Sequence, residues 1–420
     1  MIDIPLIISV ILGFILGIAS GLTPGLHSNN FAALMLALSP AFFWLGLDPV
    51  DLAAAILAAS VAQTFLDIIP SIFIGAPDAE TSLAVLPGHE MMLEGKGIEA
   101  VRLSALGSAS SVLVAVVLIV PLSLIFSSFY EPFMEHVGFV LLAIAAFMIL
   151  TERGRVIEGQ GSLVHLKYKL LALALFLTSG FLGMFAFGHQ EIARSPLGFK
   201  PEVLLPLLGG LFGASMLLLS LASRAEIPDQ RDTQFDLPAA GITRAAFVGG
   251  LAGSVVAWVP GVTPAVATVA TRLGSEGSDR EFLISISGVN TANALFTLVA
   301  LYVVGRTRSG AAVAIEELVD LNLPLLLFML IVVLFVSILS YFATLAAGRA
   351  AAMVVRRIDY RILCIAVLAF LTAMTFGFTG PFGLFLYFLS TVVGLAAPIA
   401  GIRKTHAMGV LMVPLIAYYL

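Results

Sequence analysis

The first residues whose types could do chemistry follow directly on an apolar stretch near the start of the chain. The run PLIISVILGFILGIA (residues 5–19) gives way to SGLTPGLHSNN (residues 20–30), in which Pro24-Gly25 breaks the helix. A second half-helix that starts near Ser28 would direct its free N–H groups and the positive end of its dipole at the break. This arrangement is typical of an anion-binding site. The polar side chains around it belong to Thr23, His27, Ser28, Asn29 and Asn30.

The second half of the chain carries a matching set of polar residues. The stretch WVPGVTPAV is broken at Pro260-Gly261 and adds Thr263. The next apolar stretch after each break contains a polar pair, Gln63-Thr64 in SVAQTFLD and Asn290-Thr291 in SGVNTANA. We expect both sets to surround one negatively charged group. The predicted substrate-binding residues are Thr23, Pro24, Gly25, His27, Ser28, Asn29, Asn30, Gln63, Thr64, Pro260, Gly261, Thr263, Asn290, Thr291 and Asn293.

Each of these features also has a purely structural interpretation. One Pro-Gly pair is often only a kink, and Ser, Thr and Asn often hold membrane helices together without binding a ligand. His27 alone could be an interhelical hydrogen-bond donor. Two matching breaks, each followed by a polar pair, favour the binding interpretation.

Asp67 is an acidic residue within the apolar stretch FLDIIPSIF. An ionisable group inside a membrane segment is a functional candidate, and coupling to sodium or to protons is the role we expect for it. The alternative is an interfacial carboxylate that caps the neighbouring hairpin. Asp78, Glu80, His89 and Glu90 lie nearer the expected cytoplasmic surface, where we expect them to be solvated.

Composition decides the class of protein. Of the 420 residues, 60% are hydrophobic and 11% are charged, with a mean hydropathy of +1.07. Soluble domains carry about 25% charged residues. The chain is therefore expected to be an all-α polytopic protein of the plasma membrane, with no role in nucleic-acid binding. Its single cysteine, Cys364, excludes an internal disulfide, and the first helix lacks the features of a cleaved signal peptide.

About ten stretches are long enough to span a bilayer. Four further segments are interrupted or too polar to cross, and we expect them to form hairpins that enter the membrane and return. With this arrangement most Lys and Arg residues fall on one face, which the positive-inside rule makes cytoplasmic. The hairpin segments are 4–46, 75–95, 243–272 and 305–320.

The breaks divide the chain into two blocks of five full spans each, residues 1–235 and 236–420. An odd number of spans per block inverts the second block relative to the first. Inverted repeats with discontinuous helices are typical of secondary transporters, whose substrate lies near the midplane at the breaks.

The stretch IPSIFIGAPDAETSLAVLPGHEMMLEGKGIEAVRLSALGSASS (residues 69–111) resembles the large membrane subunit of the tripartite tricarboxylate transporters, the TctA family. GLTPGLHSN and WVPGVTPAVAT are similar to its two Pro-Gly motifs, and SGVNTANALFTL to its Asn-Ala-rich segment. The chain departs from the family at GRTRSGAAVAIEEL, where another Pro-Gly stretch is usual. The resemblance implies a transport scaffold, a small membrane subunit and an extracytoplasmic binding protein as partners.

We therefore expect a secondary-active transporter of an organic anion, a di- or tricarboxylate, that uses alternating access and a Na+ or H+ gradient. The alternative is a transporter of a lipid-linked anion such as a polyprenyl phosphate, because the same half-helix ends would bind phosphate. An enzyme is disfavoured, since the sequence has no HExxH, GxSxG, CxxC or phosphate-loop motif. No metal site or cofactor is expected beyond the coupling ion, and a homodimer stays open.

Overall fold

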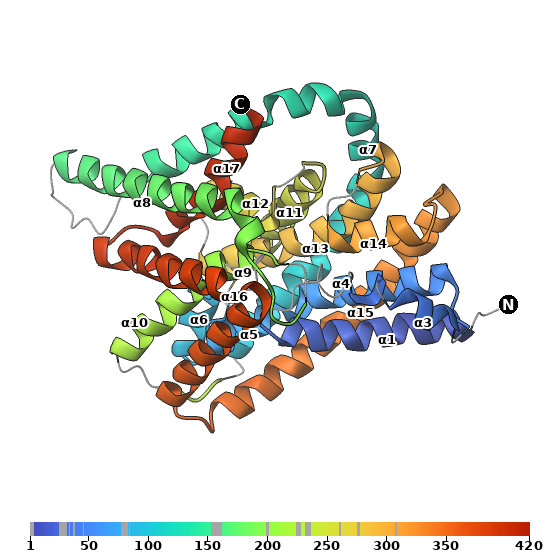
Figure 1. The fold of residues 1–420 in the computed structure, drawn as a ribbon, viewed down its shortest axis with the longest axis horizontal. Coiled ribbons are helices and arrows are strands. Elements are labelled where there is room, and N and C mark those ends of the chain that lie inside the picture. Colours follow the sequence, from blue (N-terminus) through green and yellow to red (C-terminus); the bar gives the residue numbers. More distant parts are fainter. Residues whose placement is uncertain are drawn as a thin grey trace.

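The fold is that of a computed structural model, which describes residues 4–24, 32, 34–36, 38–44, 46–76, 83, 85–152, 162–198, 201–223, 228–231, 237–259, 262–274, 278–306 and 309–420. Over these ranges the ordered elements are helices without any strand, and nine of the helices are long and apolar enough to cross a membrane. The expected all-α polytopic membrane fold is confirmed (Figure 1).

The elements fall into two series along the chain. The first comprises α1 (Ile4–Leu22), α3 (Ser39–Trp44), α4 (Pro49–Leu66), α5 (Ile68–Ile74), α6 (Val85–Leu93), α7 (Gly97–Leu150), α8 (Ser162–Gly188), η2 (Gln190–Ile192), α9 (Leu204–Leu208), η3 (Gly209–Ala214) and α10 (Ser215–Ser223). The second comprises α11 (Ala239–Val256), α12 (Pro264–Gly274), α13 (Asp279–Val304), α14 (Gly310–Leu318), α15 (Leu323–Val355), α16 (Tyr360–Ala400), η4 (Lys404–Met408) and α17 (Gly409–Tyr419).

Two helices are much longer than the spans expected from the sequence. The stretches 100–126 and 131–152 are joined in α7, which has 54 residues and curves along one edge of the molecule (Figure 1). The stretches 360–376 and 380–398 are joined in α16, with 41 residues and a kink at Gly380. One crossing needs about 20 residues, so each of these helices is long enough to cross twice.

Glycine explains the kink in α16. Gly380 has φ 66°, a left-handed conformation that other residues rarely adopt, and a Cβ there would lie 2.5 Å from Arg194 O. The following Pro381 cannot donate to the preceding turn. Gly380 is therefore non-helical, and α16 consists of two helices joined at this residue.

Helix α1 packs on α4 with almost no side chain between the two backbones. A Cβ at Gly13 would lie 2.2 Å from Ala55 O, and one at Gly17 would lie 2.4 Å from Ala59 O. Small residues permit such close approach between membrane helices. Because the residue numbers rise together along the contact, α1 and α4 run parallel.

Helix α11 packs on α13 in the same way. A Cβ at Gly249 would lie 2.5 Å from Ser285 O, and one at Gly253 would lie 2.3 Å from Val289 O. This pair is also parallel. In each half, a glycine-lined helix that leads to a Pro-Gly pair lies against a long helix.

The small residues of the stretch 104–111 join α7 to α13. A Cβ at Gly107 would lie 2.2 Å from Ile284 O, and the hydroxyls of Ser104 and Ser287 are 2.7 Å apart. Ser108 donates to Ser287 O at 3.2 Å. This segment, on which the family resemblance partly rests, therefore attaches the first half of the chain to the second.

Helices α4 and α13 form the centre of the molecule. Nearly all of their residues are buried, whereas α1, α7, α8, α15 and α16 expose many large apolar side chains, as lipid-facing helices do. Both central segments end at a glycine in the left-handed conformation. The α4–α5 segment ends at Gly75 (φ 64°), and α13 ends at Gly305 (φ 62°). The two central helices are thus shielded from lipid, and polar residues on them are protected from it.

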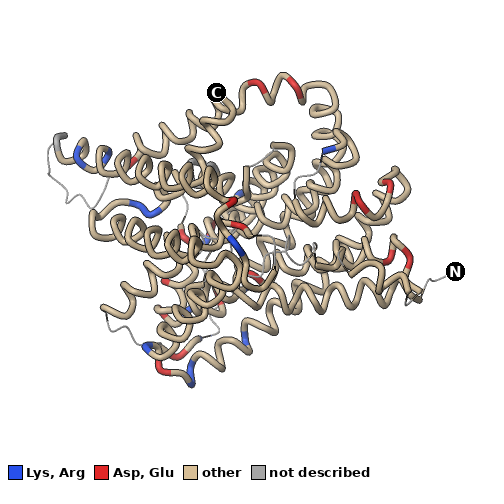
Figure 2. Tube along the Cα trace, viewed as in Figure 1, with Lys and Arg blue, Asp and Glu red and all other residues tan. Residues whose placement is uncertain are grey.

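Charged residues gather at the ends of the helices (Figure 2). Among the residues that the structure describes, few Lys and Arg lie at the end of the molecule that carries the N-terminus and α14, and most lie toward the opposite end (Figures 1 and 2). This asymmetry is the pattern that the positive-inside rule describes.

Candidate functional site

The structure describes part of the predicted site. Residues 25–31 and 260–261, which include most of both Pro-Gly pairs, lie outside the described residues. The candidate residues that are described are Thr23, Pro24, Gln63, Thr64, Asp67, Thr263, Asn290, Thr291 and Asn293. The predicted site residues outside the description are Gly25, His27, Ser28, Asn29, Asn30, Pro260 and Gly261.

Polar residues of the two halves meet between α4 and α13. The Asn290 amide nitrogen donates to Asp67 Oδ2 at 2.7 Å, and the Thr291 hydroxyl donates to Thr64 Oγ1 at 3.2 Å. All four side chains are buried. Because the later residue on α4 contacts the earlier one on α13, the two helices run antiparallel. The structure thus joins residues that the sequence analysis selected from opposite halves.

The end of α1, just before the first break, lies beside the contact between Asp67 and Asn290. A Cβ at Gly21, near the end of α1, would lie 2.9 Å from Leu66 Cβ and 3.1 Å from Gln63 O. Thr23 and Pro24 follow within three residues. Thr23 itself donates to Ala19 O at 2.8 Å, so its hydroxyl hydrogen is used within α1.

The second break leads into α12. The Thr263 carbonyl accepts from Val266 N at 3.0 Å and from Ala267 N at 3.2 Å, and Pro264 is the first helical residue. Thr263 therefore occupies the N-cap position, which Thr favours, with Pro at its preferred place behind it. The positive end of the α12 dipole lies at this break.

Two predicted site residues carry buried oxygens that no neighbour satisfies. Asn290 Oδ1 and Thr263 Oγ1 have no hydrogen-bond partner within the described ranges. Such an atom costs about 1–3 kcal/mol when it stays unpaired. Both atoms are consequently available to a polar ligand.

Asp67 lies between α4 and α5 and is 4% exposed. Its side chain makes no capping hydrogen bond to α5. The alternative, a cap on the hairpin at 75–95, involves residues that lie partly outside the described ranges. The described side-chain bond of Asp67 is the one from Asn290. The carboxylate is thus held inside the helix contact.

The sequence analysis matched Gln63-Thr64 with Asn290-Thr291, but counting back from the glycines that end the two helices gives a different correspondence between the halves. Gln63 and Asn293 each lie twelve residues before the left-handed glycine that ends their helix, Gly75 and Gly305 respectively. Measured in this way, Gln63 corresponds to Asn293. Asn290 lies almost one turn earlier, where it meets Asp67.

The sequence analysis missed Trp258, which lies just before the second break. It is fully buried and stacks on Phe126, with ring centroids 4.6 Å apart at 8°. Its indole nitrogen has no hydrogen-bond partner among the residues described. A tryptophan two residues before a Pro-Gly pair was the available signal, but large aromatic residues usually serve packing.

The expectation for His89 was wrong, whereas Glu90 is exposed as expected. His89 is fully buried, with Nδ1 2.8 Å from Ile72 O and Nε2 2.7 Å from the Tyr360 hydroxyl. Because a carbonyl can only accept, Nδ1 carries the hydrogen and Nε2 accepts from Tyr360. Burial lowers the pKa of His89, so the ring is neutral and ties α6 to α16.

No group of three or more His, Cys, Asp or Glu side chains that could hold a metal ion occurs in the described part of the chain. The part of the predicted site that the structure describes consists of hydroxyl and amide groups, one carboxylate and a helix N-terminus. In an integral membrane protein, such groups at discontinuous helices are those of a transporter.

The comparisons with known proteins identify the family. The profile of the Tripartite tricarboxylate transporter TctA family matches residues 7–409, and the chain belongs to this family. Family members are transporter subunits, not enzymes, and work with a small membrane subunit and a binding protein.

One curated relative is an uncharacterised protein of the archaeon Methanocaldococcus jannaschii. It is 26% identical over 410 residues, which cover 94% of each chain. No solved structure matches this chain.

Proposed function

We propose that the chain is a secondary-active transporter of a di- or tricarboxylate, driven by a Na+ or H+ gradient. The observation that carries the proposal is the buried contact of Asp67 and Thr64 with Asn290 and Thr291, beside the end of α1. Membership of a tricarboxylate transporter family supports the substrate class.

In this proposal the anion lies between the two breaks. The N-terminus of α12, with Thr263, would bind one carboxylate. Asn290 Oδ1 would face a hydroxyl or a protonated carboxyl of the substrate. The remaining predicted residues complete the cage: His27, Ser28, Asn29 and Asn30 at the first break, and Gln63, Thr291 and Asn293 on the central helices.

Asp67 is the candidate for ion coupling. Its buried carboxylate can bind a proton or, with neighbouring oxygens, Na+. Because Asn290 contacts Asp67 and carries an unpaired oxygen, it would link the ion to the substrate.

Two inverted repeats, residues 1–235 and 236–420, would provide alternating access. Three observations support this: the parallel glycine contacts of α1 with α4 and α11 with α13, the antiparallel course of α4 and α13, and the glycine ends at Gly75 and Gly305. The hairpins expected at 4–46, 75–95, 243–272 and 305–320 belong to this proposal.

The test is uptake into proteoliposomes. Labelled citrate and succinate should enter under an inward Na+ gradient or pH gradient and stay out of protein-free vesicles. Asn290→Ala should slow uptake at least about fivefold, because it removes a bond to the substrate and also leaves the buried Asp67 carboxylate without this donor, a loss of about 1–3 kcal/mol. The matched variant Asn322→Ala, at an exposed helix cap, should transport normally. Absence of uptake with every gradient, by the chain alone and also together with a small membrane subunit and a binding protein, would contradict the proposal.

A lipid-linked anion is the second candidate, because an apolar groove lies beside the second break. The groove has a volume of about 160 Å³ and lies between α7, α11 and α12, with Val259 and Val262 flanking the break. An isoprenoid tail would fit this surface while its phosphate reached α12. Filling the groove with Val262→Trp should block transport of a lipid-linked phosphate and leave citrate uptake intact.

The family context predicts two partners for this chain, a small membrane subunit and an extracytoplasmic binding protein. Uptake by the purified chain alone would show that neither is required. The mass of the purified protein in detergent would decide whether it forms a homodimer.

A further inference from the structure

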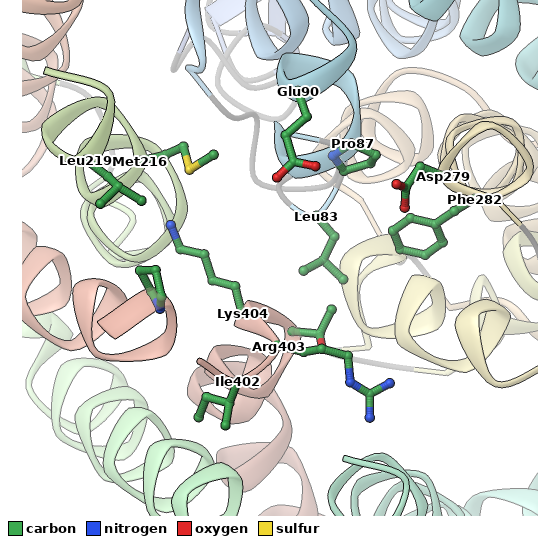
Figure 3. A pocket seen from close by; sticks show the side chains of 12 residues that line it. Leu83, Pro87, Glu90, Met216, Leu219, Asp279, Phe282, Ile402, Arg403 and Lys404 are labelled. Atoms are coloured by element: carbon green, nitrogen blue, oxygen red, sulfur yellow. The ribbon is translucent and has the colours of Figure 1, made fainter. Parts of the chain in front are cut away.

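A cavity separate from the breaks lies where α6, α10, α13, the end of α16 and η4 converge (Figure 3). Its volume is about 340 Å³, the lower end of the size range of small-molecule sites. Its walls include Lys404, Arg403 and Thr405 on one side, and Glu90 and Asp279 on the other. Glu90 and Asp279 are exposed, so the cavity is open to solvent at that side.

Lys404 is the unusual residue of this cavity. It is 6% exposed, and its ammonium donates to Ser215 Oγ at 2.7 Å and to Phe212 O at 3.3 Å. These contacts use two of its three N–H groups. Within the described residues it makes no ion pair, and burial lowers its pKa to about 7.

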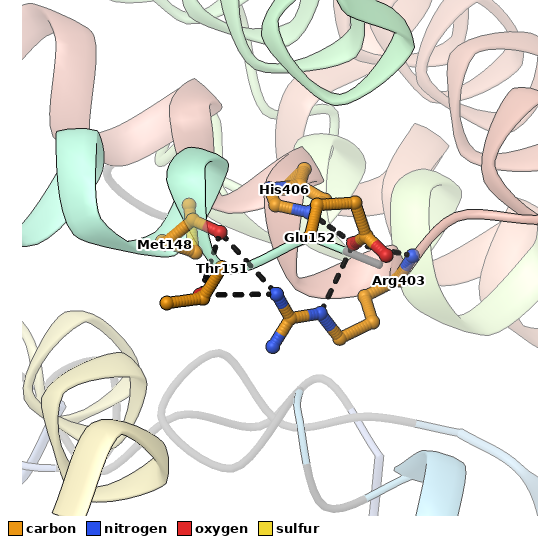
Figure 4. A network of polar contacts seen from close by, with 5 residues as sticks. All are labelled: Met148, Thr151, Glu152, Arg403 and His406. Carbon is orange, nitrogen blue, oxygen red and sulfur yellow. Dashed lines mark hydrogen bonds and ion pairs between the residues drawn. The ribbon is translucent and has the colours of Figure 1, made fainter. Parts of the chain in front are cut away.

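The neighbouring Arg403 is bound through Nε and Nη2 to the end of α7. It donates to Glu152 Oε2 at 3.0 Å, to the Thr151 hydroxyl at 3.2 Å and to Met148 O at 3.3 Å (Figure 4). His406 Nε2 lies 2.6 Å from the same Glu152 oxygen. Glu152 thus fixes residues 403–406, and Lys404 leaves the backbone on the opposite side from Arg403 (Figure 3).

The acidic groups that face the cavity do not neutralise Lys404. Glu90 and Asp279 lie across the cavity (Figure 3), and each has an interaction of its own. Ser215 donates its hydroxyl hydrogen to Leu211 O at 2.6 Å and therefore accepts from Lys404. A buried ammonium without a counter-ion is costly, and an anion in the cavity removes that cost.

We propose that this cavity is a second carboxylate site, in which Lys404 and Thr405 bind one carboxylate group of the transported anion. The proposal rests on the proposed transport of carboxylates. The cavity lies among basic residues that the positive-inside rule places on the cytoplasmic side, so the site would hold the substrate between the breaks and the cytoplasm.

Chemical labelling tests binding without any transport. Trinitrobenzenesulfonate, an amine reagent, should modify Lys404 at pH 8 at a measurable rate, with the exposed Lys167 as the reference. Citrate or succinate should slow the labelling of Lys404 several-fold, because the bound carboxylate both covers the amine and keeps it protonated. Peptide mass spectrometry would measure both rates.

Inorganic anions provide the specificity control at equal ionic strength. Chloride and sulfate should leave the labelling rate of Lys404 unchanged. Equal protection by sulfate, or no protection by either carboxylate, would overturn the proposal.

Variants separate this site from the proposed function. Lys404→Met should raise the KM for uptake about tenfold, whereas Lys404→Arg should retain much of the affinity and Lys167→Met all of it. Size-exclusion profiles would show that each variant is folded. Uptake with an unchanged KM in Lys404→Met would refute the second site alone. Protection of Lys404 by citrate in a protein that transports no carboxylate would support the site and refute the transport proposal.

Discussion

At the scale of single residues, the contact between Asp67 and Asn290 is the centre of the proposed transport site. The 2.7 Å hydrogen bond between them is buried and links opposite halves of the chain. Both residues could be selected from the sequence, because a carboxylate or an amide inside an apolar span has to be justified by a partner or a function. Their pairing could not be selected, since it depends on how α4 and α13 cross.

Asp67→Asn tests ion coupling. The variant keeps the shape of the side chain and an oxygen for Asn290, but it removes the charge. We expect substrate exchange between the two sides to persist while gradient-driven uptake falls to the background rate. Asp320→Asn, on an exposed loop, should behave as wild type. Gradient-driven uptake by Asp67→Asn would rule out this role.

Lys404 was not recognised as a site residue from the sequence. A basic pair at the end of a span normally anchors the helix at the membrane surface, and Arg403-Lys404 fits that description. Lys404 differs from such a surface lysine because α10 and η3 bury its side chain. This burial arises from tertiary packing, which no local sequence pattern predicts. The same limit explains His89, whose neighbours come from α5 and α16.

The pKa of Lys404 predicts a dependence of stability on pH. Between about pH 7 and its ordinary pKa near 10.5, the lysine is neutral in the folded protein but protonated in the unfolded chain. The unfolded state binds more protons there, so the free energy of unfolding should rise with pH in this window. Thermal unfolding in detergent should show a rise that Lys404→Met lacks and Lys167→Met retains. Identical slopes for Lys404→Met and wild type would contradict the buried ammonium.

At the scale of elements, the hydrophobic runs predicted most of the helices, including the division of α16 near Gly380, but misjudged the continuity of α7. The segment between the stretches 100–126 and 131–152 separates two expected spans, yet α7 continues through it, with Pro121 and Pro132 on either side of the segment and inside the helix. Membrane helices tolerate proline because neighbouring groups and local adjustments satisfy the freed backbone. Helix ends were predictable where a specific residue stops the helix, as Gly75 and Gly305 do.

The close approach of α1 and α4 predicts a large cost for a single methyl group. Gly13→Ala places a Cβ 2.2 Å from Ala55 O, so the two helices would have to separate. We expect a destabilisation of about 1–3 kcal/mol in denaturation by SDS. Gly188→Ala meets no atom within 4 Å and should change stability by less than about 0.5 kcal/mol. Equal stabilities for the two variants would refute the backbone contact.

At the scale of the whole molecule, composition alone predicted a polytopic membrane protein, and the helices confirm it. The sidedness of the molecule is testable because the chain has one cysteine, Cys364, which is buried. In a Cys364→Ser background, Glu317→Cys should react with an impermeant maleimide from outside intact cells. Arg357→Cys should react only after the cells are opened. The reverse pattern would invert the predicted topology.

The backbone contacts of α1 with α4, and of α11 with α13, have a consequence for how the protein can move. The two helices of each pair pack too closely to slide past each other, so we expect each pair to move as a rigid body. The two helix pairs contact each other through side-chain hydrogen bonds between α4 and α13. These bonds can break and re-form more readily than the close backbone contacts within each pair can separate. In the proposed alternating-access cycle, water should therefore reach Asp67 in one state and be excluded in the next, so that the hydration of this one carboxylate would distinguish the two states.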